Sequence, residues 1–101
     1  MLFMVIERFK SGEYKPVGER FRSAGRMLPD GVEYRESWVS PDGACCFQIM
    51  EAAHAGLLDA WVSHWKDLVD FEIVPVLTSS EFWSRVRRRA DSREAEPPTS
   101  Q

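Results

Sequence analysis

Three expected strands carry an acid, an amide, a phenol and an indole among apolar neighbours. Apolar walls with a few placed polar groups are what a small-molecule pocket requires. A carboxyl group buried there without a cation would have a raised pKa, which suits a general acid or base. The alternative is that these residues have structural roles only, because a glutamate on an edge strand is usually solvated and a glutamine often forms hydrogen bonds with backbone groups. The candidate ligand-binding residues are Glu7, Tyr34, Glu36, Trp38, Gln48 and Met50.

The turn at residues 40–43 determines how the second and third strands pair. It reads Ser-Pro-Asp-Gly, in which Pro and Asp fit a type I turn and Gly a following left-handed residue. If Ser40 pairs with Ala44 around a three-residue loop, one face is fixed along the whole hairpin. The predicted pairs are Trp38 with Cys46, Glu36 with Gln48, and Tyr34 with Met50. Phe47 and Ile49 would then lie on the other face, against the helices.

The remaining reactive residue types form no recognisable motif. Cys45 and Cys46 are adjacent, so on a strand they point to opposite faces and an ordinary disulfide is not expected. His54 and His64 lack metal-ligand spacing, and His54 near Glu51 is either half of a proton-shuttling pair or a surface histidine. There is no Gly-rich phosphate loop and no nucleophile–base motif. The sequence therefore predicts neither a metal nor an organic cofactor.

Composition and charge narrow the class of protein. The chain has 101 residues, 44% of them hydrophobic and 29% charged, which is typical of one globular domain. Its formal net charge of -3 argues against nucleic-acid binding, which usually needs a basic face. No apolar run approaches a membrane span. Together with the two unpaired cysteines, these features predict a cytoplasmic protein without a membrane partner.

Apolar runs and helical stripes alternate along the chain in a recognisable order. Strands are expected at residues 2–6, 32–39, 45–51 and 71–77, with helices over 16–28 and 57–68. This order predicts an α+β, ferredoxin-like β-α-β-β-α-β fold, a four-stranded antiparallel sheet with both helices on one face. Thr78 to Glu81 has the pattern of a capping box that opens a short C-terminal helix. Residues 1–90 would form the domain and 91–101 a disordered polar tail.

That architecture leaves one sheet face uncovered. A four-strand face covers on the order of 400 Å². If this face is mainly apolar, leaving it exposed to water would lose about 10 kcal/mol of hydrophobic stabilisation, at roughly 25 cal/mol for each Å² of buried apolar surface. Because this approaches the whole stability of a typical domain, we expect a homodimer that packs the open sheet faces together.

Five segments also resemble a known family. They are residues 1–7, 19–29, 37–39, 46–51 and 65–76, which include Arg20-Phe21-Arg22, Ser37-Trp38-Val39 and Trp65-Lys66-Asp67. Together they resemble a bacterial family of unknown function that is grouped with the dimeric α+β barrel proteins. The resemblance implies a homodimer whose two sheets make a barrel, and it implies no activity. The wider superfamily includes cofactor-free monooxygenases, isomerases and ligand-sensing domains, but a shared fold does not transmit function.

Three functions remain open at this point. The first is a small-molecule binder that uses the barrel or a cavity between sheet and helices. The second is a cofactor-independent monooxygenase or isomerase. The third is a non-catalytic structural or protein-interaction dimer. A cavity with a titratable group facing it favours the second, and a cavity without one favours the first. A barrel filled by side chains favours the third. The sequence leaves undecided whether the protein is an enzyme, and it gives no role to the Arg85–Arg89 run.

Overall fold

The computed structural model describes residues 1–93, with side chains through residue 90. Four strands and three α-helices make up this part of the chain, with two short 3-10 turns. The strands are β1 (Leu2–Phe9), β2 (Glu33–Val39), β3 (Cys45–Glu51) and β4 (Val69–Val76). The helical segments are η1 (Lys10–Gly12), α1 (Lys15–Ala24), η2 (Ala55–Leu58), α2 (Asp59–Ser63) and α3 (Ser79–Arg93).

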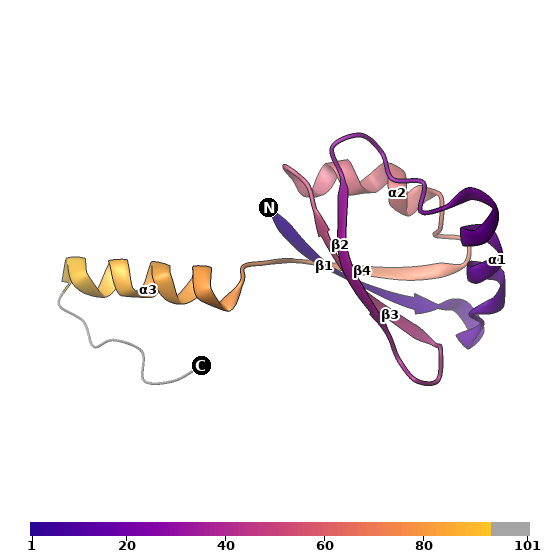
Figure 1. Ribbon diagram of the computed structural model, residues 1–101, viewed down its shortest axis with the longest axis horizontal. Helices are drawn as coiled ribbons and strands as arrows, with labels where there is room; N and C mark the ends of the chain where they lie inside the picture. The colour runs from indigo at the N-terminus through magenta and orange to yellow at the C-terminus, as the bar shows by residue number, and fades with distance from the viewer. Residues whose placement is uncertain (94–101) are drawn as a thin grey trace.

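The four strands form one antiparallel sheet in the order β2-β3-β1-β4. Figure 1 shows α1 and α2 on the same side of this sheet. This is the ferredoxin-like arrangement predicted from the sequence, and β2 and β4 lie at its two edges. Pro75 lies on the β4 edge, where its missing N–H interrupts no inner ladder.

Helices α1 and α2, which lie on one side of the sheet, are both shorter than the helices predicted over residues 16–28 and 57–68. Helix α1 ends at Ala24 because Gly25 adopts the left-handed φ of 68°. The chain then runs as an irregular segment to β2, and Met27 is also left-handed, at φ 59°. The second stripe is divided between η2 and α2, followed by turns up to β4.

The hydrophobic core lies between the inner half of the sheet and the η2–α2 segment. Alternate residues of β1, Phe3 and Val5, are fully buried on the helix side, as is Met50 of β3. Trp61 and Trp65 belong to the same cluster, as their place on the predicted stripe indicates. Burial of side chains of this size contributes roughly 1.5–3 kcal/mol each. Helix α1, by contrast, buries no residue.

The predicted register of the β2–β3 hairpin is wrong by one residue. The Ser40 N–H donates to the carbonyl of Cys45, so the loop has four residues instead of three. Its extra length is held by side chains: Ser40 Oγ accepts from the Cys45 N–H, and Asp42 Oδ1 accepts from the Ala44 N–H. The observed pairs are Ser37 with Gln48, Trp38 with Phe47, and Val39 with Cys46. A bulge between Tyr34 and Glu36 restores the predicted pairing of Tyr34 with Met50.

The slip also splits the predicted face of the hairpin, and the side chains of β3 lie on the side of the sheet opposite to the prediction. A shift of one residue moves every affected side chain to the other side of a sheet. Glu36 and Trp38 are therefore not on the same side as Gln48. The pairing of β3 with β1 puts Gln48 and Met50 on the helix side and Phe47 and Ile49 on the open face, so the predicted faces of β3 are wrong. Gly43 does adopt the predicted left-handed conformation, at φ 74°.

Helix α3 projects away from the sheet and the other helices (Figure 1). The predicted capping box opens it: Thr78 Oγ1 accepts from the Glu81 N–H at 3.0 Å, and Glu81 accepts from the Thr78 N–H at 3.1 Å. The helix continues to Arg93, three residues into the segment predicted as a disordered tail, and residues 94–101 lie outside the described part. No helix within residues 1–93 is long and apolar enough to cross a bilayer.

Candidate functional site

A cleft of about 650 Å³ separates α1 from the sheet. Its floor comes from β1, β2 and β3, and its walls come from α1, the hairpin loop and the two core tryptophans. We call it the sheet–helix cleft. Its lining residues are Glu7, Phe9, Tyr14, Val17, Gly18, Phe21, Arg26, Ser37, Val39, Ser40, Pro41, Asp42, Gly43, Cys46, Gln48, Trp61 and Trp65.

The apolar side of α1 faces this cleft, although Val17 also packs partly against the core. Val17 and Phe21 are one helical turn apart, and Phe21 remains 44% exposed. Pro16 at the start of the helix and Gly25 after its end fix its length. The sequence thus makes an amphipathic helix whose apolar stripe meets an unfilled volume. That volume falls in the range of small-molecule sites, roughly 300–1,000 Å³.

Glu7 is the buried acid of the cleft. It follows Phe3 and Val5 on the inner face of β1 and is 6% exposed. The Gln48 side-chain amide donates a hydrogen bond to Glu7 Oε2, whereas Oε1 accepts none from the described part of the chain. Burial raises the pKa of Glu7 to about 7, against smaller lowering effects of Gln48 and of the Arg26 charge. The carboxyl therefore exchanges its proton near neutral pH.

Arg26 places a cation at the same end of the cleft. Its guanidinium carbon lies 3.5 Å from the centroid of the Tyr34 ring and 5.1 Å from that of Phe21. Arg26 Nε is 3.5 Å from Gln48 Oε1, and no ion pair to Arg26 occurs within residues 1–93. The aromatic contacts hold the side chain in place and leave its charge unpaired.

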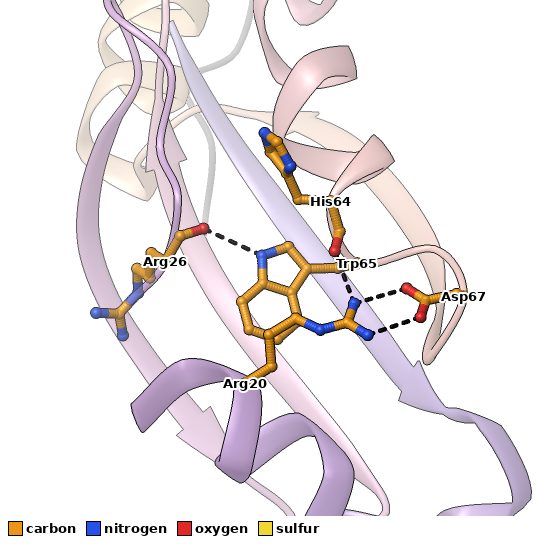
Figure 2. A network of polar contacts seen from close by, with 5 residues as sticks. All are labelled: Arg20, Arg26, His64, Trp65 and Asp67. Carbon is orange, nitrogen blue, oxygen red and sulfur yellow. Dashed lines mark hydrogen bonds and ion pairs between the residues drawn. The ribbon is translucent and has the colours of Figure 1, made fainter. Parts of the chain in front are cut away.

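Arg26 and helix α1 are tied to the α2 side of the molecule through Trp65 (Figure 2). The Trp65 indole N–H donates to the Arg26 carbonyl at 3.0 Å. Arg20 of α1 reaches past the Trp65 ring, bonds both Asp67 oxygens at 2.7 Å and donates to the His64 carbonyl at 2.9 Å. The Arg20 hydrogen bond holds the pKa of Asp67 at about 2, below its usual range. This network positions α1 over the cleft without filling it.

A thiol and an indole N–H also belong to the wall of the cleft. Burial raises the pKa of the Cys46 thiol to about 12, with a smaller contribution from the charge of Glu7, so this thiol stays protonated and is a poor nucleophile. The Trp61 indole is 2% exposed, and its N–H has no hydrogen-bond partner in the described chain. No three His, Cys, Asp or Glu side chains of residues 1–93 gather so as to hold a metal ion.

The structure divides the six predicted site residues into two groups. Glu7 and Gln48 meet in the cleft, and Tyr34 lies beside them under Arg26, its hydroxyl 2.8 Å from Ser37 Oγ. Met50 is on the same face but fully buried in the core. Glu36 and Trp38 lie on the open face, as predicted, with Trp38 52% exposed, but the register slip separates them from Gln48, which lies on the helix side.

Sequence reasoning missed the residues that complete the cleft. Ser37 and Val39 take the places that Glu36 and Trp38 were expected to hold. Arg26 lies in the segment between α1 and β2, and its position depends on the left-handed Gly25 and Met27. The one available signal was the side-chain bonding capacity of the Ser-Pro-Asp-Gly turn, which lengthens the loop. Of the two alternatives for His54, the structure shows the surface histidine: His54 is exposed, and Glu51 pairs with Arg35 instead.

Comparison with known proteins places the chain in a family. A family model described as Domain of unknown function (DUF3303) matches residues 1–90. The chain belongs to this family. No curated protein and no solved structure matches it significantly. Membership of the DUF3303 family agrees with the predicted resemblance to a family of unknown function and supplies no activity.

Proposed function

We propose that the protein binds a small, largely aromatic organic molecule in the sheet–helix cleft. One observation carries this proposal: the apolar stripe of α1 covers an unfilled volume of about 650 Å³ that ends on a buried acid. An amphipathic helix normally buries its stripe against protein, whereas α1 buries no residue. A ligand in the cleft would cover Val17 and Phe21 and exclude water from the polar end.

The lining favours a ligand with an aromatic body and one polar end. Phe9, Phe21, Trp61 and Trp65 supply ring surfaces along the cleft. Glu7, Gln48 and Arg26 gather at one end, where they can fix the orientation of a polar group. Aromatic molecules with one carboxylate or carbonyl group are therefore the first compounds to screen.

Gly18 offers a test that separates binding from stability. It lines the cleft from α1, and a Cβ built on it meets no atom within 4 Å. Gly18→Phe should fill the cleft, whereas Gly18→Ala replaces the same glycine with little added volume. Both changes favour the helix over glycine, alanine by about 1 kcal/mol and phenylalanine by roughly half as much. A thermal-shift screen with small aromatic acids should find compounds that stabilise the wild type and Gly18→Ala but not Gly18→Phe. Stabilisation of all three proteins alike, or of none, would remove the basis for this function.

We propose a homodimer as the assembly that carries this site. The open face of the sheet presents apolar side chains from all four strands. They are Leu2, Met4, Ile6, Trp38, Phe47, Ile49, Val74 and Val76. Helix α3 projects from the same body (Figure 1). Its Phe82 is 47% exposed and makes an edge contact with Trp83. A second copy of the chain is the occupant that a self-complementary apolar face fits best.

The areas support this choice of partner. A four-strand face about seven residues long covers roughly 450 Å², and one side of α3 adds roughly 200 Å². The sum approaches the roughly 800 Å² that each partner contributes to a standard interface. With two sheets packed in this way, the assembly would be that of the dimeric α+β barrel proteins.

Analytical ultracentrifugation at micromolar concentration tests the assembly. The wild type should sediment as a dimer, and Ile49→Lys, which places a charge at the centre of the open face, as a folded monomer. Asp30→Asn changes the net charge by the same amount on an exposed loop and should remain dimeric. A wild type that sediments as a monomer would contradict the proposed dimer.

A further inference from the structure

We propose that the sheet–helix cleft is a proton-transfer site for an enolisable carbonyl compound that bears an aromatic ring and a carboxylate. In this site Glu7 takes the proton from the carbon beside the carbonyl, and Arg26 holds the oxygen that becomes negative. The inference rests on the proposed binding function and specifies its substrate class and chemistry.

The surroundings of Glu7 suit a group that both accepts and returns a proton. Gln48 fixes one carboxyl oxygen, and the other oxygen accepts no hydrogen bond from residues 1–93. Burial brings the pKa close to neutral, the condition under which a general acid–base is most effective. The cross-strand neighbours are Cys46 of β3, whose thiol stays protonated, and Phe71 of β4, which is apolar.

The other acid in the cleft is already engaged. Asp42 accepts from the Ser40 hydroxyl and the Ala44 N–H, and these bonds lower its pKa. It therefore stays a carboxylate that is held within the hairpin loop. Glu7 is left as the acid of the cleft that can change its protonation state near neutral pH.

Arg26 is the counterpart that an anionic oxygen needs. Its charge is unpaired within the described chain, and the Tyr34 ring holds its guanidinium plane at the polar end of the cleft. The left-handed Gly25 and Met27 on either side constrain the backbone, and Trp65 holds the Arg26 carbonyl. A cation fixed in a partly buried site stabilises negative charge that develops during a reaction more than one in water does.

The step is balanced without a cofactor or a redox partner. The C–H bond beside the carbonyl breaks, and its proton passes to a Glu7 oxygen. The electron pair of that bond forms a carbon–carbon double bond, and the carbonyl π pair moves to the oxygen, which faces Arg26. Glu7 then returns the proton to that oxygen, which gives the enol, or to carbon, which gives the ketone.

Phenylpyruvate is a suitable probe because it has an aromatic ring, a carboxylate and an enolisable carbon. In deuterated buffer the wild type should accelerate deuterium incorporation at the benzylic carbon, measured by proton NMR. Glu7→Gln should lower this acceleration by at least about 100-fold, the usual contribution of general acid–base catalysis. Glu19→Gln makes the same change at an exposed position of α1 and should leave the rate unchanged.

Phenylglyoxylate separates this inference from the binding function, because it has the ring and the carboxylate but no enolisable hydrogen. It should bind the wild type and Glu7→Gln equally, bind Arg26→Met more weakly, and fail to bind Gly18→Phe. Binding of phenylglyoxylate without any exchange of phenylpyruvate would overturn the inference and leave the binding function standing. Exchange that survives in Glu7→Gln would also overturn it, and the absence of both binding and exchange would overturn both proposals.

Discussion

Replacing Glu7 by glutamine should change how the stability of the protein depends on pH. Burial raises the pKa of Glu7 from 4.5 to about 7, so the folded protein holds this proton more tightly than the unfolded chain does. The stability that this proton confers is complete below pH 4.5 and is lost as the pH rises through about 7. Glutamine resembles the protonated acid in shape and cannot ionise.

The expected size of the effect follows from the two pKa values. Between about pH 5 and about pH 8, ionisation of Glu7 should remove about 2.5 kcal/mol of unfolding free energy. This is a large share of the roughly 5–15 kcal/mol that stabilises a typical domain. Glu7→Gln lacks this loss, so its stability relative to the wild type should rise by the same amount over the interval.

Urea unfolding of both proteins at the two pH values measures this difference. Protein concentration is held constant, because a dimer adds a concentration term to the apparent stability. All other titrating groups are common to both proteins and cancel in the double difference. Parallel pH dependence of wild type and variant would refute the reasoning, since it would mean that Glu7 titrates in the folded protein as it does in water.

Two further predictions concern the walls of the cleft. In urea unfolding, Gly43→Ala should destabilise the protein by about 1–3 kcal/mol more than the control Gly12→Ala. Both glycines have positive φ, but only at Gly43 would an added Cβ lie 2.9 Å from the Tyr14 ring. Equal losses would show that Tyr14 does not press on the hairpin loop. Arg20→Leu should raise the pKa of Asp67 from about 2 towards its usual 3.8, measured by NMR titration, and should weaken ligand binding by releasing α1. An unchanged Asp67 titration would contradict the tie between α1 and the α2–β4 segment.

The sequence predicted the fold well because each strand and helix has a strong local pattern. The apolar run after Met1, the Thr78–Glu81 capping box and the left-handed Gly43 all have the structure that their residue types favour. These features depend on a few neighbouring residues.

The site was predicted only in part, because it depends on the register of one hairpin and on which face of the sheet meets the helices. Two hydrogen bonds, accepted by the Ser40 hydroxyl and the Asp42 carboxylate from backbone N–H groups, hold a loop one residue longer than predicted. The longer loop exchanges Glu36 and Trp38 for Ser37 and Val39. Glu7 and Gln48 were both identified, but their side of the sheet was not. The position of Arg26 follows from the irregular path after α1, which no periodic pattern describes.

Methyl NMR of the protein with a compound from the thermal-shift screen tests the central claim most directly. Val17 and Val39 line the sheet–helix cleft, whereas Ile6 and Ile49 lie on the open face of the same sheet. We predict intermolecular NOEs from the compound to the two valines and none to the two isoleucines. NOEs confined to the isoleucines would place the ligand on the open face and contradict the account.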